Sequence, residues 1–293
     1  MSKVNRNFKA SVFTHLFRDP ENEYELYNAV VPGRFPPGTA VRDVTLSDAL
    51  YMDRVNDLSF LVGDKLVVFF EHQGSISENM PLRDLIYCGR VYEMIVASTV
   101  IYSETRVMIP TPEFYVLYNG AKPFPEKATY KLSDSYSLPT EGEPALELVV
   151  HVYNVNMGYN EDIVRRSETL NGYVTLVSKA REHERSGMER ADAVRAAVEE
   201  CIKLGLLVDY LEKYTSEVIN MLLREWSWDE ARAVWEREAE ARGEARGEAR
   251  GEARGEARGE ARGEARERTK WTSVVADKDA TIAELKARLS KQQ

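Results

Sequence analysis

Two short apolar runs separated by three turn-forming residues form the clearest pattern along the chain. Residues 58–62 and 66–73 are rich in β-branched and aromatic side chains, and Gly63-Asp64-Lys65 lies between them. This pattern predicts a β-hairpin with a three-residue loop. In such a hairpin Val62 pairs with Leu66, which fixes the pairing of every other residue.

The same register places two acids at the open end of the hairpin. Leu58 lies opposite Phe70 on an apolar face, whereas Asp57 lies opposite Glu71 on the other face, and Gln73 points the same way as Glu71. Cross-strand neighbours are about 5 Å apart at Cβ. Two carboxylates that close repel unless a cation lies between them, and a divalent metal ion is the usual cation. A two-residue loop would shift the register and send the acids to opposite faces.

Apolar residues at helical spacing surround the hairpin. Residues 1–32 predict helix, interrupted at Asp19-Pro20, and residues 31–38 predict a loop. Pro81 suits the first turn of a further helix, whose apolar positions up to Ile95 fit burial against a sheet. Further strands are expected at 108–109, 114–117 and 145–152. The order of helix, strand, strand, helix and strand predicts an α/β fold with a mixed sheet flanked by helices.

The pattern turns helical from about Asp162 onward. Apolar residues between Val194 and Ile202 follow the i, i+3, i+4, i+7 rule, and Gly205 fits the end of that helix. We therefore expect a helical C-terminal half.

Residues 243–266 are perfect copies of the tetrapeptide Gly-Glu-Ala-Arg. Like charges recur every four residues, and each Gly costs about 1 kcal/mol relative to Ala, so the tract alone predicts a marginal helix. A neighbouring helix would stabilise it; a flexible, charge-balanced spacer is the alternative. Beyond the tract, four apolar residues at heptad positions predict a short coiled-coil seam. These are Val275, Ile282, Leu285 and Leu289.

These patterns predict four parts and a mode of assembly. We expect an α/β core at 1–160, a helical extension packed on it at 161–236, the repeat linker or helix at 237–270 and a coiled-coil tail at 271–293. The tail predicts a homo-oligomer.

Composition narrows the class of protein. The net charge of −9 lacks the overall basic footprint usual for nucleic-acid binding, although local basic patches coexist with acidic surfaces. Cys88 and Cys201 sit in helical, apolar contexts, which is typical of a reduced cytoplasmic protein rather than a disulfide framework. No apolar signal region begins the sequence and no run approaches 18 apolar residues, so we expect a cytoplasmic protein that does not enter a membrane.

The spacing Asp-x13-Glu-x-Gln across the hairpin resembles the PD-(D/E)XK nuclease motif, with Asn56 in place of the motif's proline and Gln73 in place of its commoner lysine. Further segments resemble, in the same order, the Rpn family of bacterial recombination-promoting nucleases and putative transposases. These segments are 5–9, 11–13, 25–29, 79–83, 118–120, 154–160 and 217–221. The resemblance implies a restriction-endonuclease-like core.

The resemblance also implies a site. Asp57 and Glu71 would bind Mg²⁺ or Mn²⁺, with the backbone carbonyl of His72 as a further ligand, while the His72 side chain points to the opposite face of its strand. Gln73 would orient the attacking water through its amide. Glu25 resembles a helix-borne acid that assists the metal, with an exposed helical glutamate as the alternative.

Arg83, near a helix start, is a candidate to hold a DNA phosphate; a surface arginine is the alternative.

The leading functional hypothesis is a metal-dependent DNA endonuclease that hydrolyses phosphodiester bonds, linked by the resemblance to recombination or transposition. The alternative is a catalytically weak or inactive protein that oligomerises through its repeat and coiled-coil tail. A retaining glycoside hydrolase would use a similar acid pair, but it leaves Gln73 and the ordered segments without a role.

Overall fold

The computed structural model of this chain describes residues 11–46, 57–138 and 142–290, and the sequence segment at 5–9 lies outside them. The chain divides into two compact units, Met1–Asp229 and Glu230–Gln293. The first unit is an α/β fold in which helices flank a six-stranded sheet.

The sheet has the strand order β1-β2-β3-β4-β6-β5. Its strands are β1 (Val41–Asp43), β2 (Leu58–Val62), β3 (Leu66–Gln73), β4 (Thr111–Tyr118), β5 (Lys127–Lys131) and β6 (Val149–Asn154). β3, β4 and β6 run parallel, and the other pairings are antiparallel, so the sheet is mixed. The carboxyl ends of the three parallel strands therefore open at the same edge of the sheet.

The predicted hairpin is confirmed, including its register. Val62 pairs with Leu66, and Leu58 pairs with Phe70. Gly63 and Asp64 both have positive φ, which a tight turn requires and which Gly and Asp tolerate better than most residues. Successive side chains of each strand point to opposite faces of the sheet, so both faces carry apolar side chains from β2 and β3.

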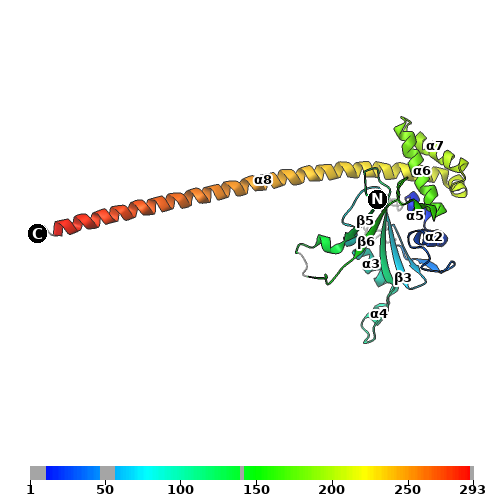
Figure 1. Cartoon of the computed structure of the whole chain (residues 1–293), viewed down its shortest axis with the longest axis horizontal. Coiled ribbons are helices and arrows are strands. Elements are labelled where there is room, and N and C mark those ends of the chain that lie inside the picture. The colour runs from blue at the N-terminus through cyan, green and yellow to red at the C-terminus, as the bar shows by residue number, and fades with distance from the viewer. Residues whose placement is uncertain (1–10, 47–56, 139–141, 291–293) are drawn as a thin grey trace, which may run out of the picture. The chain divides into compact units, whose positions relative to one another are not determined.

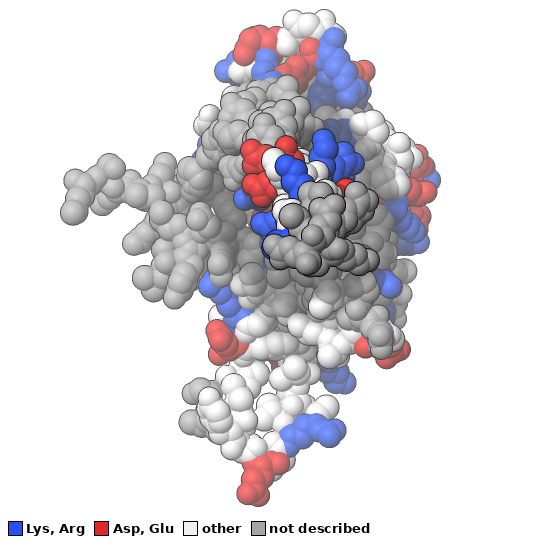
Figure 2. Space-filling view, turned by 90° about the vertical axis from the view of Figure 1, so that its left-hand side faces the viewer, with Lys and Arg blue, Asp and Glu red and all other residues white. Residues whose placement is uncertain are grey.

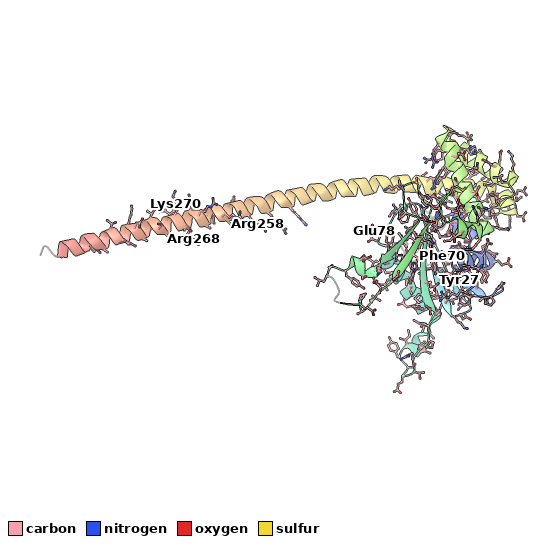
Figure 3. The ribbon with its side chains drawn as sticks, in the orientation of Figure 1. Tyr27, Phe70, Glu78, Arg258, Arg268 and Lys270 are labelled. Atoms are coloured by element: carbon pink, nitrogen blue, oxygen red, sulfur yellow. The ribbon has the colours of Figure 1, made fainter. Side chains whose placement is uncertain are left out.

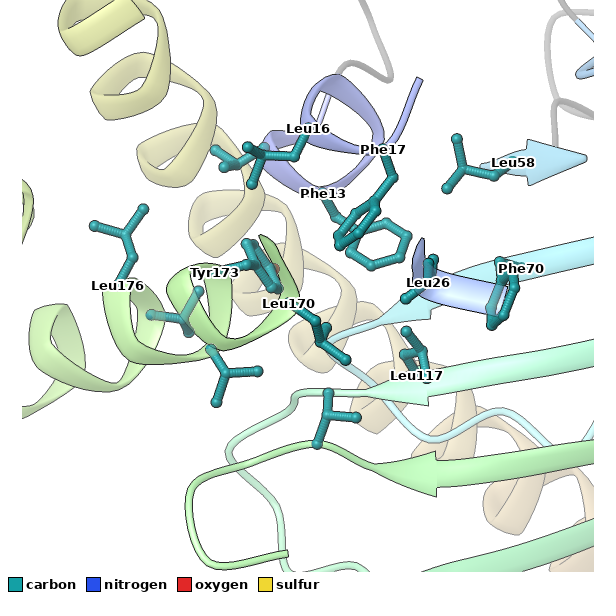
Figure 4. Packing of buried hydrophobic residues seen from close by; sticks show 14 of the residues in the cluster. Phe13, Leu16, Phe17, Leu26, Leu58, Phe70, Leu117, Leu170, Tyr173 and Leu176 are labelled. Atoms are coloured by element: carbon teal, nitrogen blue, oxygen red, sulfur yellow. The ribbon is translucent and has the colours of Figure 1, made fainter. Parts of the chain in front are cut away.

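One face of the sheet is covered by the first helices and by the helical C-terminal half (Figure 1). The helices are α1 (Val12–Leu16), α2 (Pro20–Val30), α5 (Glu161–Arg165), α6 (Glu168–Arg185), α7 (Arg190–Lys203) and the start of α8 (Val208–Ser290). The expected break at Asp19-Pro20 is confirmed, because Asp19 caps α2 by accepting a hydrogen bond from Glu21 N. Figure 4 shows Phe13, Phe17 and Phe70 among the buried side chains of the core that these helices share with the sheet.

The other face carries α3 (Met80–Ile95), which also brings side chains to the open end of the hairpin. Met80, Tyr87 and Val91 are buried against Val67 and Phe69 of β3. The short helix α4 (Ser98–Ile101) and a 3-10 turn at Leu132–Ser135 complete the first unit. Pro81 lies in the first turn of α3, as expected.

Two predicted strands need correction, and two observed strands were missed. Residues 108–109 form no strand, and Met108 is 84% exposed, because the buried part of this segment begins only in β4. Residues 145–148 precede β6 instead of belonging to it. β1 and β5 were not predicted at all.

The helix α8 continues through the Gly-Glu-Ala-Arg tract, with a local break in helical geometry at Tyr214. In its part within the second unit, Arg258, Arg268 and Lys270 project from the helix (Figure 3). Trp271 is 66% exposed there. Within the described residues, no helix combines the length and apolar character of a membrane span.

Candidate active site

Asp57 and Glu71 meet at the open end of the β2–β3 hairpin, as the register predicts. The backbone N–H of Asp57 donates a hydrogen bond to Glu71 Oε1 over 3.2 Å. The Asp57 carboxylate Oδ2 in turn accepts a hydrogen bond from the backbone N–H of His72 over 2.8 Å. Each carboxylate is thus anchored to the backbone of the partner strand, and this holds the two acids together.

The Glu71 carboxylate is buried, with only 3% of the residue exposed. Burial is the main cause that raises its pKa well above the usual value, and the negative charges of Asp57 and Asp84 raise it further. Arg83 opposes this shift, because its Nη2 lies 3.0 Å from Glu71 Oε2. The raised pKa means that a negative charge on Glu71 is costly at this position. A cation between Glu71 and Asp57 would offset this cost.

Helix α3 supplies the wall that faces these acids. Arg83 contacts Glu71, the Sδ of Met80 over 3.1 Å and the hydroxyl of Tyr87 over 3.4 Å. The amide nitrogen of Gln73 donates to the same Met80 sulfur over 2.6 Å. Arg83 is therefore an ion-pair partner of Glu71, a position that neither interpretation of the sequence foresaw.

Asp84, on α3, is a third acid close to Asp57 and Glu71, and sequence reasoning missed it. It is 1% exposed, and its Oδ1 has no hydrogen-bond partner. Burial raises its pKa to about 7, Arg83 lowers it, and Asp57 raises it. A signal was present in the sequence, because Asp84 falls on the same buried stripe of α3 as Met80, Tyr87 and Cys88. An acid at a core position of an amphipathic helix is unusual enough to mark a site.

The His72 side chain lies on the opposite face, as predicted. Its Nε2 is 2.9 Å from the hydroxyl of Tyr173, and its ring stacks on Phe13 with 4.9 Å between the ring centroids. Burial, helped by the charge of Arg181, lowers its pKa to about 3. This imidazole is therefore neutral near pH 7, and only the backbone of His72 belongs to the acid pair.

Glu25 joins two helices on the other face of the sheet. Its carboxylate accepts hydrogen bonds from the backbone N–H of Thr169, over 3.2 Å, and from the Thr169 hydroxyl, over 3.0 Å. These contacts tie α2 to the first turn of α6. The structure gives Glu25 this packing contact and does not bring it into the cluster around Glu71.

Glu23, also on α2, is a second buried acid outside the site. It is fully buried and neither carboxylate oxygen has a hydrogen-bond partner. Burial raises its pKa to about 8, Asp43 and Asp19 raise it further, and Arg18 opposes them. Because an uncharged carboxyl costs less to bury than a carboxylate, Glu23 keeps its proton in the folded protein at neutral pH.

We expect the stability of the native protein to fall as pH rises from about 5 to about 9, and the Glu23→Gln variant to lose this dependence. Between the ordinary glutamate pKa and the raised one, the folded chain binds a proton that the unfolded chain releases, so the free energy of unfolding falls as pH rises through this window. Urea unfolding at about pH 5 and about pH 9 checks this. The variant should gain stability relative to native protein only at the higher pH, whereas Glu21→Gln, an exposed change on the same helix, should gain at neither.

The donor atoms at the hairpin end fit a hard divalent cation. Mg²⁺ prefers oxygen ligands, binds through one or two carboxylates and keeps several waters. Asp57 and Glu71 offer two carboxylates, and the His72 carbonyl is a further oxygen. Among the residues that the structure describes, no group of three or more His, Cys, Asp and Glu side chains is placed to hold a metal ion. The chain would thus supply two acids and leave the remaining positions to carbonyl oxygen and water.

Comparison with known proteins identifies no relative of this chain. No family model, no curated protein and no solved structure matches the chain.

Proposed function

We propose that this chain is a metal-dependent DNA endonuclease that hydrolyses phosphodiester bonds. The observation that carries the proposal is the meeting of Asp57 and Glu71 at the open end of the hairpin, where Glu71 is buried and its pKa is raised by burial and by Asp57. Such an acid pair favours a divalent cation, and strongly perturbed acids are typical of catalytic sites. DNA as the substrate is supported by the resemblance of Asp-x13-Glu-x-Gln and its accompanying segments to the Rpn family.

The roles of the chain's residues follow from their positions. Asp57 and Glu71 would hold Mg²⁺ or Mn²⁺, with the His72 carbonyl beside them. The ion would lower the pKa of a water molecule and offset the charge that develops on the scissile phosphate. Gln73, two residues after Glu71 on β3, has an amide oxygen suited to accept a hydrogen bond from that water. Arg83 balances the charge of Glu71 when the pair holds no cation.

We also propose that the first unit has a restriction-endonuclease-like core. A hairpin, a helix and a parallel strand in this order support a restriction-endonuclease-like core, in which the acids lie at the ends of the second and third strands of the sheet. A role in recombination or transposition is implied only by the resemblance.

Incubating supercoiled plasmid with the purified full-length chain tests the proposal. We expect conversion to nicked or linear plasmid with Mg²⁺ or Mn²⁺ and none with EDTA. Cutting that persists in EDTA would point to metal-independent chemistry or to a contaminant, and intact plasmid under all metal conditions would contradict the proposed activity.

A second candidate function is supported by the second unit. There Trp271, Val275 and Ile282 are exposed apolar side chains on one helix, at positions d, a and a of a heptad pattern. An oligomerising protein that acts through this coiled-coil tail would use them to pair with a second copy. Sedimentation of the full chain beside a variant with all three changed to serine distinguishes the cases, because only a tail-mediated oligomer dissociates in the variant.

A further inference from the structure

A polar cavity of about 330 Å³ opens at the carboxyl ends of β4 and β6. Asn119 follows the last residue of β4, and Asn154 is the last residue of β6. The side chain of Asn156 bridges the two strand ends, since its amide nitrogen donates to Asn154 Oδ1 and to the carbonyl of Gly120. Ligands of open α/β sheets bind at this kind of position, outside the carboxyl ends of the parallel strands.

Positive charge gathers around this cavity although the chain as a whole is acidic. Lys122, Arg181 and Arg185 line it, and the described lining residues include no aspartate or glutamate. Lys122 and Arg185 are exposed, and within the described residues neither forms an ion pair. Figure 2 shows side chains of both charges mixed over the face that it presents. A local excess of cations without acids attracts an anion.

A hydrogen-bond network holds the side chains that line the cavity. Arg181 donates hydrogen bonds to Asn119 Oδ1 over 2.9 Å, to the Asn119 carbonyl and to Asn156 Oδ1 over 3.1 Å. Asn119 is 3% exposed, yet its amide nitrogen, a hydrogen-bond donor, has no partner. A buried donor without a partner is costly, so an anion that accepts its hydrogen bond would be stabilised there.

A loop of the cavity approaches the end of β3. A Cβ atom on Gly120 would lie 2.2 Å from the carbonyl oxygen of Gly74, so only glycine permits this approach between the two loops. Gly74 directly follows Gln73, the last residue of β3. The loop that carries the cavity therefore packs against the end of the strand that carries Glu71.

We propose that this pocket binds a phosphate group of a nucleic-acid backbone, held by Lys122, Arg185 and the amide of Asn119. Arg181, already engaged with neutral oxygens, positions Asn119. Tyr159 and Met157 line the same pocket and are 42% and 58% exposed, which suits contact with the sugar or base attached to that phosphate. The inference rests on the proposed function for the identity of the polymer, and it adds a substrate subsite beside the cutting site.

The test is the affinity of the full chain for a fluorescein-labelled DNA duplex in EDTA, where no cutting occurs. We expect the Lys122→Gln/Arg185→Gln variant to bind about tenfold more weakly, because charge-assisted hydrogen bonds to one phosphate are lost. Its plot of log affinity against log salt should be shallower by about 0.9, as for one phosphate. The matched control is Lys65→Gln/Arg106→Gln, which removes the same charge from two exposed cations outside the pocket that, among the described residues, also form no ion pair; it should retain native affinity. Thermal melting of both variants checks that they remain folded.

Several outcomes would overturn the assignment. These are native affinity in the pocket variant, an equal loss in the control, or a native chain that binds no DNA in EDTA. Stabilisation of the native chain by inorganic phosphate, with unchanged DNA affinity in the pocket variant, would assign the pocket to free phosphate instead. If plasmid is never cut but the pocket variant binds DNA weakly, the nuclease fails and the pocket stands. If plasmid is cut and the pocket variant binds DNA with native affinity, the phosphate pocket fails and the nuclease stands.

Discussion

Changing Glu71 to glutamine is expected to reduce metal-dependent nicking of plasmid by at least about 100-fold, since even the outer partners of metal ligands contribute 10–100-fold. The amide keeps an oxygen that accepts the hydrogen bond from Asp57 N, so the local geometry survives. It removes the negative charge that a cation would need. Arg83 loses its ion-pair partner, but its side chain is 38% exposed and remains hydrated, so we expect the variant to fold.

Gel densitometry of the plasmid and calorimetric titration with Mn²⁺ measure the two consequences, loss of cutting and loss of metal binding. Asp57→Asn should behave in the same way. Asp64→Asn is the matched control, because it makes the same chemical change at the closed end of the same hairpin, where Asn tolerates the positive φ. Native cutting by Glu71→Gln would remove this residue from the proposed site, and loss of cutting by Asp64→Asn would indicate damage to the hairpin.

Truncating Phe70 to alanine is expected to lower the free energy of unfolding by about 3–5 kcal/mol, the usual cost of removing a buried aromatic ring. Phe70 is fully buried in β3. Its ring stacks between Phe60, at 6.1 Å between centroids, and Tyr115, at 5.2 Å. Its loss would leave a cavity between the sheet and the helices that cover it.

Hydrogen exchange of the β3 amides at increasing urea concentrations measures this change in the first unit specifically. Met108→Ala, at an exposed position, should change stability by no more than about 0.5 kcal/mol. A loss below about 1 kcal/mol in Phe70→Ala would mean that the sheet and its helices pack more loosely than the described core.

The hairpin was predictable because turn chemistry and alternation act over a few residues. Gly63 and Asp64 set the loop, and the loop set the register that brings Asp57 to Glu71. The edge strands were not predictable in this way. β1 has three residues and β5 alternates exposed and half-buried side chains, so both depend on a neighbouring strand that is distant in sequence.

The site was partly predictable for the same reason. The acid pair comes from one hairpin, but the pairing of Arg83 with Glu71 depends on how α3 lies across the sheet. Glu25 shows the opposite case, because its partner Thr169 is 144 residues away and no local pattern announces that contact. Asp84 could have been identified from helical spacing alone, because it falls among the apolar residues of one stripe of α3.

The ends of the sheet bear on how this chain meets other proteins. Lys127 and Lys131 occupy alternate, exposed positions of the edge strand β5, and lysines on an edge discourage another strand from joining it. The opposite edge strand, β1, is only three residues long. A partner that adds its own strand to a sheet therefore finds little to pair with at the described edges. These edges favour recognition of partners through helices or loops instead.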